Sequence, residues 1–454
     1  MAEVSRRRFL QVSSGTAVAA LVPGTPAMLA ADQSGTVTST AEQSSAEQPA
    51  TNADPVRFAS IGVGIQGSSL LRAAVTLPQG QCVAACDLYD GRHTLAREIA
   101  GAGIKTTRSY REILDDKNIE CVIVAVPDHS HARITIDALD AGKDVYCEKP
   151  MSHSIAEGEA MVQAVDRSKH FVQVGSQRVS SQLFLKARQL QESGAIGDVL
   201  QVELALGRNS PGGAWQYPPP LDLSPANLDW EAWLGSGPKK PFDSITFARW
   251  RCWKEYGTGM AGDLMVHLLS GMQIATGINA IPDQATSVGG IYRWKDGRNM
   301  PDLQVTTFRY GEVPVSVRLT LGTETPEMTR LMGPKGTIEV TANSVIYTPQ
   351  LGVDRSPDYG LNGFPSAMHA RYERQWHAEH DPLLAAHALD ETTVWRGPSW
   401  DDLKPHVANF FHSVRTRQPV VEDVVFGHHA AAACHMANTS YFEGKTITRA
   451  KKAG

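Results

Sequence analysis

The chain contains 454 residues, of which 42% are hydrophobic and 20% are charged, and it carries a formal net charge of −5. This composition is typical of a globular protein, and the length allows two domains that each bury a core. The slight negative charge provides no extended basic surface, so nucleic acid is not expected as a partner.

The N-terminal part of the chain is expected to direct export and then to act as a linker. A twin-arginine pattern, SRRRFLQ, occupies residues 5–11, and a modestly apolar stretch follows before small residues near Ala30. That stretch is too short to cross a bilayer as a helix, so no integral membrane segment is expected in the mature protein. We predict a signal peptide over residues 1–31, a disordered linker over residues 32–54, and a mature protein that is periplasmic or extracellular.

A glycine-rich turn joins the first predicted strand to the first predicted helix. The apolar run over residues 56–61 suits a buried strand, and residues 68–75 are amphipathic. Between them, Gly62-x-Gly64-x-x-Gly67 has the spacing of a dinucleotide-binding turn, in which the backbone approaches a pyrophosphate and the helix packs close to the strand. The N-terminal end of the helix would hold the phosphates. The cofactor contacts expected within this turn are Gly62, Gly64, Ile65, Gln66 and Gly67.

An acidic residue at the end of the second predicted strand favours NAD over NADP. The apolar run over residues 81–86 ends at Asp87, which follows Gly67 by 20 residues, the separation at which a carboxylate can accept hydrogen bonds from the adenosine ribose. A carboxylate there repels a 2′-phosphate, and no arginine follows Asp87 directly, although Arg92 could turn toward a phosphate. We therefore predict NAD as the cofactor, with NADP as the less favoured alternative.

Strands and helices continue to alternate up to residue 176, which predicts a doubly wound parallel sheet. A continuously apolar run over residues 121–126 is typical of a central strand covered on both faces. Further strands are expected over residues 144–147 and 171–174, and helices over residues 91–100, 130–141 and from the capping box Ser154-x-x-Glu157 onward. Residues 55–176 are therefore predicted to form an α/β Rossmann domain that binds NAD.

The pattern changes beyond Gln177 to longer strands of alternating polarity, which predicts an α+β domain over residues 177–454. A helix is expected over residues 181–193, and strands over residues 199–206, 303–310, 313–321 and 336–341. Their spacing suits a large, mostly antiparallel open sheet packed on helices. A segment rich in proline and tryptophan, residues 208–254, could either form a wall of a sugar site or serve to order a long loop.

Three stretches outside the glycine turn carry side chains suited to catalysis. The sequence VPDHSH over residues 126–131 follows the central strand, at whose carboxyl end cofactors sit in open α/β sheets. The sequence CEKP over residues 147–150 ends the next strand and faces the same crevice. Residues 257–277 are expected to lead into a helix that ends at Gly277. Asp263 and His267 would share one face of that helix, because they are four residues apart.

These motifs, in this order, resemble those of the Gfo/Idh/MocA oxidoreductase family from residue 56 nearly to the C-terminus. The resemblance is strongest to exported members related to glucose–fructose oxidoreductase and to the glycoside and inositol dehydrogenases. The motifs that carry it are Gly62-x-Gly64-x-x-Gly67, Pro127-Asp128-x-x-His131, Glu148-Lys149-Pro150, Val174-Gly175-Ser176-Gln177 and Asp263-x-x-x-His267.

The resemblance implies an NAD(H)-dependent enzyme that oxidises a secondary hydroxyl of a sugar or glycoside. In that reaction His267 would accept the hydroxyl proton, Lys149 would polarise the oxygen, and Asp263 would orient the imidazole or relay the proton. An alternative with the same first step is a redox-neutral, NAD-dependent glycoside hydrolase that works by transient oxidation and elimination. A sugar-binding protein that carries the cofactor without catalysis, with a surface Asp–His pair and a salt-bridged lysine, is a third interpretation.

Further contacts and partners follow from the same comparison. The family implies a homodimer or homotetramer built through the second sheet, and an exported enzyme is expected to bind its cofactor tightly because free NAD(H) is scarce outside the cytoplasm. The remaining cofactor contacts expected are Pro127, His129, His131, Glu148, Lys149 and Gln177, and the substrate contacts expected are Arg178, Trp253 and Tyr256.

No metal site is predicted. His129 and His131 have no third ligand nearby, and the six cysteines contain no Cys-x-x-Cys pattern and lie mostly on predicted buried strands. The later histidines could support the fold, line the substrate or bind a metal, and this choice stays open for His377, His380, His428, His429 and His435.

Overall fold

The computed structural model describes residues 54–352, 354, 356–386, 391–397 and 402–449. The predicted signal peptide and all but the last residue of the predicted linker lie outside these described residues. None of the helices in the described part of the chain combines the length and the apolar character that crossing a membrane requires.

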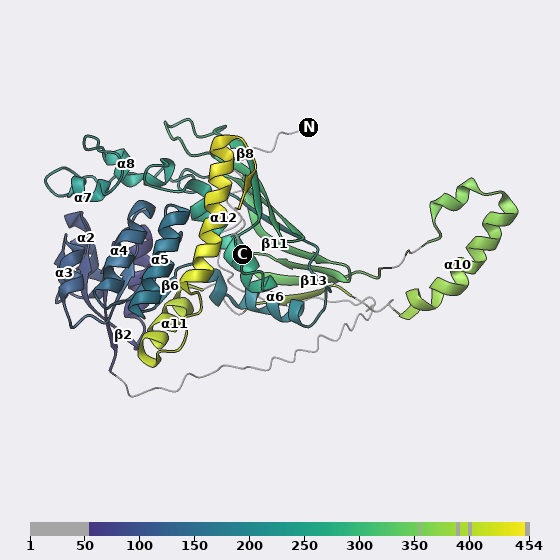
Figure 1. Ribbon diagram of the computed structural model, residues 1–454, viewed down its shortest axis with the longest axis horizontal. Coiled ribbons are helices and arrows are strands. Elements are labelled where there is room, and N and C mark those ends of the chain that lie inside the picture. Colours follow the sequence, from purple (N-terminus) through teal and green to yellow (C-terminus); the bar gives the residue numbers. More distant parts are fainter. Residues whose placement is uncertain (1–53, 353, 355, 387–390, 398–401, 450–454) are drawn as a thin grey trace, which may run out of the picture. The chain divides into compact units, whose positions relative to one another are not determined.

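Six parallel strands form the first sheet, in the order β3-β2-β1-β4-β5-β6, and this sheet lies in the purple to blue part of the ribbon in Figure 1. The strands are β1 (Val56–Ile61), β2 (Gly80–Cys86), β3 (Lys105–Thr107), β4 (Cys121–Val124), β5 (Asp144–Cys147) and β6 (Val172–Val174). The helices between them are α1 (Ile65–Val75), α2 (Asp90–Ala100), α3 (Tyr110–Asp115), α4 (Asp128–Asp140) and α5 (Ile155–Ser168). α1 and α2 pack on one face of the sheet and α3, α4 and α5 on the other, which confirms the predicted doubly wound Rossmann sheet.

Two of the helices begin earlier than predicted, both at the edge of the sheet where the strands end. α1 begins at Ile65, inside the glycine motif, and α4 begins at Asp128, directly after Pro127, so that the central strand β4 already ends at Val124. A proline fixes the backbone at a helix start and has no N–H to leave unpaired. The N-cap half of the predicted capping box is confirmed, because the Glu157 N–H donates to Ser154 Oγ over 3.2 Å, but the Glu157 side chain accepts from the His153 N–H rather than from that of Ser154.

Nine strands form the second sheet, in the order β14-β13-β12-β11-β7-β10-β9-β8-β15, and β7 and β10 are its parallel pair while the other neighbours run antiparallel. The strands are β7 (Gln201–Gly207), β8 (Gln284–Gly290), β9 (Leu303–Tyr310), β10 (Val313–Thr320), β11 (Thr325–Gly333), β12 (Gly336–Val340), β13 (Ser344–Pro349), β14 (Thr393–Arg396) and β15 (Ile447–Thr448). This confirms the predicted large, mostly antiparallel sheet.

Five strands of the second sheet were not predicted: β8, β11, β13, β14 and β15. β8 contains two glycines and few apolar residues, and β11 contains Pro326, so neither has the local propensity of a strand. Pairing with well-predicted neighbours holds them in the sheet instead. β8 lies beside β9, and β11 lies between β7 and β12.

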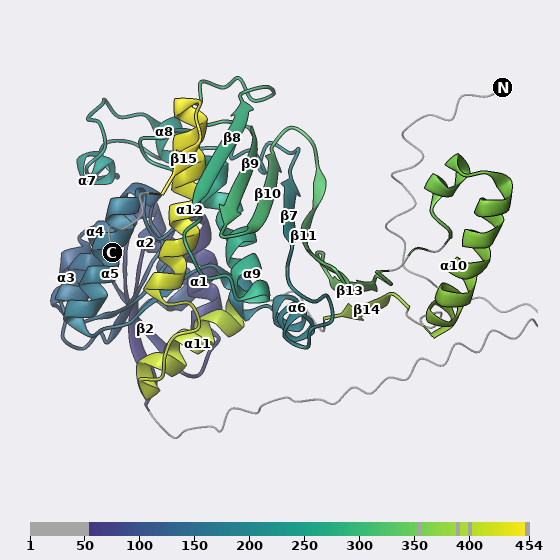
Figure 2. The ribbon, with the colours of Figure 1, turned by 45° about the vertical axis from the view of Figure 1, so that its right-hand side comes forward.

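Two helices cover one face of the second sheet. α6 (Gln182–Glu192) and α9 (Val266–Thr276) pack against each other and against the sheet (Figure 2). Phe184 of α6 and Leu269 of α9 share one core with inward-facing strand residues such as Val317 and Leu331. A short 3-10 helix, η2 (Gln177–Ser180), links β6 to α6 and thus joins the two sheets in the chain.

The two last helices return to the first sheet. α11 (Leu403–Thr416) contacts α1 and β1, where Phe411 lies against Phe58 with ring centroids 5.1 Å apart. α12 (Val424–Glu443) contacts α5 and β6 of the first sheet as well as α9 and β8. α12 is alanine-rich and buried on most sides, because it packs against both halves of the molecule. The core of the first sheet is therefore completed by residues from the far end of the sequence.

Connecting segments hold the remaining short elements. The segment rich in proline and tryptophan carries α7 (Trp230–Leu234), α8 (Ser244–Ala248) and the 3-10 helix η3 (Trp250–Cys252). Most of its aromatic side chains pack in one cluster beside Tyr89, whereas Trp215 and Tyr217 pack in the core of the second sheet. Another 3-10 helix, η5 (Tyr359–Gly363), and helix α10 (Ser366–Ala386) lie between β13 and β14, and α10 buries none of its residues.

Candidate active site

The glycine turn has the tight geometry that its sequence predicts. Gly62 has a φ of +89°, and a Cβ placed there would lie 2.3 Å from the Ala125 carbonyl oxygen. A Cβ on Gly67 would lie 2.1 Å from the Gly62 carbonyl oxygen, so α1 can approach β1 only because this residue has no side chain. A Cβ on Gly64 would instead meet the Arg92 guanidinium, at 3.3 Å, on the side of the turn that faces the cleft. These are the separate roles that a dinucleotide turn assigns to its three glycines.

Two adjoining cavities run along the carboxyl ends of β1, β2 and β4. Their volumes are about 260 and 410 Å³, and they share the lining residues Arg92, Ala125, Val126, Pro127 and Trp233. We call the smaller, which contains Gly64 and Lys149, the catalytic cavity, and the larger, which contains Gly62 and Asp87, the adenosine cavity. A groove that extends in both directions from the turn fits a dinucleotide, whose two nucleosides lie on either side of the pyrophosphate.

Asp87 lines the adenosine cavity, as predicted for a ribose contact. Its carboxylate is nearly buried and accepts hydrogen bonds from the Val63 N–H at 2.8 Å and the Tyr89 N–H at 3.0 Å. Arg92 forms an ion pair with Asp87 over 3.3 Å and lies against the Phe247 ring. The arginine that was considered as a phosphate ligand is therefore already neutralised by the carboxylate that favours NAD.

The Glu148 side chain forms hydrogen bonds with two of the residues predicted to contact the cofactor, Gln66 and Gln177. Its Oε1 atom accepts hydrogen bonds from Gln66 Nε2 and Gln177 Nε2, both at 3.0 Å, and its Oε2 atom accepts one from the Lys149 N–H at 3.1 Å. Burial raises the pKa of the Glu148 carboxyl, and the charge of Lys149 opposes that effect. All four residues line the catalytic cavity next to the glycine turn.

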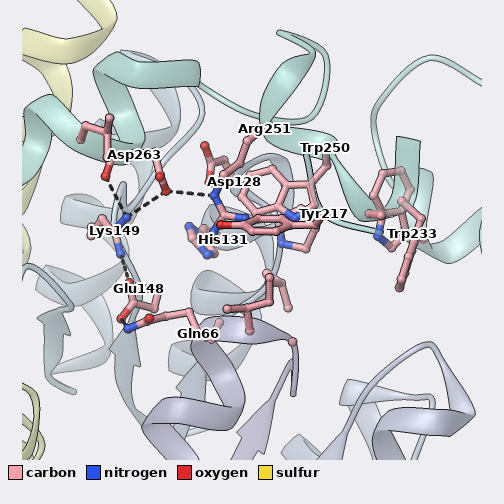
Figure 3. A pocket seen from close by; sticks show the side chains of 18 of the residues that line it. Gln66, Asp128, His131, Glu148, Lys149, Tyr217, Trp233, Trp250, Arg251 and Asp263 are labelled. Carbon is pink, nitrogen blue, oxygen red and sulfur yellow. Dashed lines mark hydrogen bonds and ion pairs between the residues drawn. The ribbon is translucent and has the colours of Figure 1, made fainter. Parts of the chain in front are cut away.

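Lys149, Asp263 and Arg251 form a buried charge network at the centre of the catalytic cavity (Figure 3). Lys149 Nζ donates to Asp263 Oδ1 and to the Asp263 carbonyl oxygen, both at 3.0 Å. Arg251 Nε donates to the same Oδ1 at 3.0 Å, and Trp215 Nε1 donates to Oδ2 at 3.2 Å. Burial alone would raise the pKa of Asp263, but the charges of Lys149 and Arg251 outweigh it and hold that pKa far below its usual value.

His267 lines the same cavity as Asp263, but it is not a hydrogen-bond partner of the Asp263 carboxylate among the described residues. Asp263 lies in a π-helical turn, η4 (Ala261–Met265), and His267 in the following α9. Among the described residues, the Asp263 carboxylate bonds to Lys149, Arg251 and Trp215 and not to His267. Burial, followed by the nearby charges of Lys149 and Arg178, lowers the pKa of His267 well below 6.5.

The two histidines after β4 have different surroundings. His131 lines the catalytic cavity, and its Nδ1 atom is 2.7 Å from the Pro150 carbonyl oxygen. Its Nε2 atom is buried and has no hydrogen-bond partner among the described residues. Burial lowers the pKa of His131 to about 4, so that the ring is neutral. His129 was expected to contact the cofactor, but its two ring nitrogens meet the carbonyl oxygens of Trp233 and Tyr256, and it tethers α4 to the aromatic segment instead.

The three residues predicted to contact the substrate lie outside the catalytic cavity. Tyr256 is buried in the aromatic cluster and its hydroxyl donates to the Pro238 carbonyl oxygen at 3.2 Å. Trp253 packs against the same cluster, and Arg178 binds Glu327 and Asp402. The side chains that do line the cavity opposite the glycine turn are Arg208, Tyr217, Trp250 and Arg251. They come from residues 208–254, the segment for which a sugar-site wall was one of two interpretations, and no local pattern distinguishes them within it.

Of the five histidines whose role the sequence leaves undecided, four make local contacts. His435 Nε2 lies 3.3 Å from Ser152 Oγ, and His429 Nδ1 lies 2.8 Å from Asn279 Oδ1. His377 pairs with Asp381, and His380 stacks on Trp376. His428 is buried in α12. Within the described ranges no three His, Cys, Asp or Glu side chains are grouped as a metal would need, and all six cysteines are free.

Comparison with known proteins places the first domain. Residues 56–176 match the family model GFO_IDH_MocA, described as an oxidoreductase family with an NAD-binding Rossmann fold, so this part of the chain is an NAD-binding domain. An inositol 2-dehydrogenase of Salmonella typhimurium is 31% identical over 144 residues, which cover 31% of this chain and 43% of that protein. The chain thus matches less than half the length of that relative.

A second kind of relative covers more of the chain. A levoglucosan dehydrogenase of Pseudarthrobacter phenanthrenivorans is 27% identical over 313 residues, which cover 65% of this chain and 66% of that protein. A solved structure described as levoglucosan dehydrogenase in complex with NADH and levoglucosan aligns with a TM-score of 0.63 at 17% identity, covering 87% of this chain and 99% of the other. The alignment shows that the two chains share the two-sheet fold.

Proposed function

We propose, from the place of its first domain in the Gfo/Idh/MocA oxidoreductase family, that the protein is an NAD(H)-dependent oxidoreductase acting on a secondary hydroxyl of a sugar or glycoside. One observation carries the proposal. Lys149, Asp263 and His267 line the same cavity as the glycine turn, so a proton acceptor and a cation lie next to the place for a nicotinamide. The inositol and levoglucosan dehydrogenases among its relatives support a polyhydroxylated substrate.

The residues of the cavity can be assigned steps in such an oxidation. Bound NAD supplies the hydride acceptor. Lys149 has three N–H donors, of which the Asp263 contacts engage two, so the third can donate to the substrate oxygen as it becomes a carbonyl. His267 is neutral because of burial and can accept the hydroxyl proton. Asp263 is a positioning residue here, since it holds Lys149 and Arg251 in place.

The test is to replace the two reacting side chains separately. Lys149→Ala and His267→Ala should each lower kcat by about a thousandfold, because each removes a group that acts on the oxygen or its proton in the transition state. NADH affinity, measured by fluorescence titration, should change little in His267→Ala. Turnover near that of the unaltered protein in both variants would contradict the proposal.

Redox-neutral glycoside cleavage uses the same first step and is the alternative outcome of a second experiment. In that reaction transient oxidation acidifies the neighbouring C–H, the aglycone is eliminated, water adds and the hydride returns. The enzyme is incubated with aryl glycosides and no added NAD. Release of many equivalents of phenol favours the glycosidase, whereas release that needs external NAD recycling favours the dehydrogenase.

We also propose that the protein is exported and retains its cofactor. The twin-arginine pattern at residues 5–11 supports export of the folded protein, and replacing both Arg6 and Arg7 by lysine should keep it in the cytoplasm. Retention through dilution requires nanomolar affinity, about 12 kcal/mol of binding free energy. Protein purified without added nucleotide should therefore release near-stoichiometric NAD(H) on denaturation, and an empty protein would contradict retention.

We further propose a homodimer or homotetramer built through the second sheet. The uncovered face of that sheet supports this, because β9 alternates buried and exposed residues along its length. Light scattering at micromolar concentration should give a mass above that of one chain, and a monomer there would contradict the proposal.

A further inference from the structure

Arg208 differs from the other cations that line the catalytic cavity. Arg92, Lys149 and Arg251 each form an ion pair with a carboxylate. The Arg208 guanidinium makes no hydrogen bond or ion pair with any residue that the structure describes, although its side chain is only partly exposed. A cation removed from water without a counter-charge is unfavourable, so its retention in the cavity points to a ligand that supplies the negative charge.

The backbone fixes the place of Arg208. It follows β7 directly, and its N–H donates to the Thr320 carbonyl oxygen at 2.8 Å, which extends the pairing of β7 with β10. Its charge reaches the reacting centre, since it is among those that add to burial in lowering the pKa of His267. The same charge opposes the rise that burial gives to the pKa of Tyr217. Arg208 therefore stands beside the place where the substrate hydroxyl would react, on a rigid strand end.

The free polar groups on this side of the cavity are mainly donors. Arg251 engages Asp263 through Nε, and no hydrogen bond from its terminal nitrogens joins them to a described residue. The Tyr217 hydroxyl is likewise unbonded within the described ranges. The carboxylates near these donors are already engaged: Asp263 accepts from three side chains including Trp215, and Asp128 Oδ2 accepts from the N–H and the hydroxyl of Thr258. A neutral sugar presents as many donors as acceptors, whereas a carboxylate presents acceptors alone.

We propose that Arg208 binds a carboxylate of the substrate, so that the enzyme acts on an acidic sugar or glycoside such as a uronate. This inference rests on the proposed function, because it places the oxidised hydroxyl within an anionic molecule. The guanidinium fork matches a carboxylate with two parallel hydrogen bonds, and Arg251 and Tyr217 can donate to the same group or to neighbouring oxygens. The binding adds no chemical step to the hydride transfer.

The test compares matched substrates that differ only in one group. Methyl glucoside, methyl galactoside and methyl mannoside are each paired with the methyl uronate, in which CH₂OH is replaced by COO⁻, as both anomers. NAD reduction gives kcat and KM, and calorimetric titration into the NADH complex gives binding without turnover. Arg208→Gln removes the charge, and Arg208→Lys keeps it but loses the fork. Arg318→Gln, on an exposed position of β10 outside the cavity, removes an equal charge as the matched control.

For the reactive pair, the uronate should be preferred over the neutral glycoside by about tenfold or more in kcat/KM. Arg208→Gln should abolish that preference by raising KM for the uronate about 30-fold, with the neutral partner changed less than about threefold. Arg208→Lys should recover part of it, and Arg318→Gln should leave it intact. The melting temperatures of the variants should be close to that of the unaltered protein, since the Arg208 guanidinium makes no hydrogen bond or ion pair with a described residue that its loss would break.

The remaining outcomes separate this inference from the proposed function. If a neutral glycoside is oxidised in preference to its uronate and Arg208→Gln changes neither, the anion site is wrong and the oxidoreductase stands. Uronate binding that depends on Arg208 but gives no NADH supports the anion site and contradicts the proposed reaction. Failure of every pair to bind or react contradicts both.

Discussion

The two walls of the catalytic cavity hold their polar groups in different ways. The first wall, the Rossmann side, uses backbone: Gly62 and Gly67 let β1 and α1 approach closely, and Asp87 accepts from two backbone N–H groups. The second wall uses side chains from separate segments, namely Arg251 from η3 and Asp263 from the π turn. Asp263 accepts from Arg251 and, across the cavity, from Lys149.

The difference shows what each wall can tolerate. Backbone geometry leaves no room for a substitution at a close contact, but it makes few demands on the surrounding side chains. A network of buried charges tolerates changes of shape yet depends on every partner, because removing one leaves another charge uncompensated. The first wall therefore suits an invariant ligand such as a dinucleotide, and the second suits a ligand that distinguishes one protein from its relatives.

The largest effect is expected where the first wall is tightest. Gly67→Ala would place a Cβ 2.1 Å from the Gly62 carbonyl oxygen, so the helix must move away from the strand. We expect a loss of about 3 kcal/mol or more in the free energy of unfolding, measured by urea denaturation. Gly64→Ala is the matched control, because its Cβ would meet only the mobile end of Arg92. It should cost less than about 1 kcal/mol in stability while weakening NADH binding.

The next largest effect is expected in the charge network of the second wall. Asp263→Asn keeps the shape but leaves Lys149 and Arg251 without their shared carboxylate, and both side chains of the Lys149–Asp263 pair are mostly buried. We expect a loss of about 3 kcal/mol in the free energy of unfolding. Asp140→Asn, in an ion pair with Arg167 that is about half exposed on both sides, should cost less than about 1 kcal/mol. Equal losses in the two variants would contradict the contrast.

An intermediate effect is expected at Asp87, where the first wall does rely on a side chain. Asp87→Asn leaves one carbonyl oxygen for two backbone donors and turns an amide N–H₂ toward one of them. We expect a loss of about 1–3 kcal/mol in stability. The change also releases Arg92 from its ion pair, so the ratio of NAD to NADP affinity should fall. Asp140→Asn, at the exposed pair with Arg167 outside both cavities, is the control and should leave the ratio unchanged.

The smallest effect is expected for pH near neutrality. The pKa of His267 lies below 6.5 because of burial, and the neutral ring is the form that accepts a proton. Lowering the pH from 7.5 to 6.5 should therefore change kcat/KM by less than about twofold, and the rate should fall only at lower pH, as the ring gains its proton. A fall centred at or above pH 6.5 would show that another group is the base.

The first wall could be predicted from sequence because its requirements are local. The Gly62-x-Gly64-x-x-Gly67 spacing and the distance to Asp87 reflect the geometry of a single strand–turn–helix unit and the strand after it. Lys149 was found for the same reason, since it follows the end of β5. Each of these residues is fixed by a short stretch of chain, so one sequence suffices to place it.

The second wall could not be predicted in the same way. Arg208, Tyr217 and Trp250 come from different parts of a long segment, and only the folded aromatic cluster decides which side chains reach the cavity and which, like Tyr256, are buried. The π turn at Asp263 has no sequence signal in its spacing, which reads as an ordinary α helix. Because these loops take their structure from tertiary contacts, the residues that would determine substrate choice could not be identified from the sequence.

Because α11 packs on β1, the core of the first sheet can be completed only near the end of synthesis. A ribosome completes residues 56–176 well before Phe410 and Phe411 leave the exit tunnel, so the nascent first sheet exposes Phe58 until the last helices arrive. Because residues between 208 and 267 also line the catalytic cavity, we expect the cofactor to bind the finished polypeptide rather than the growing one. Polypeptides released early, without α11 and α12, would meet chaperones and proteases as unfinished proteins instead of surviving as free NAD-binding fragments.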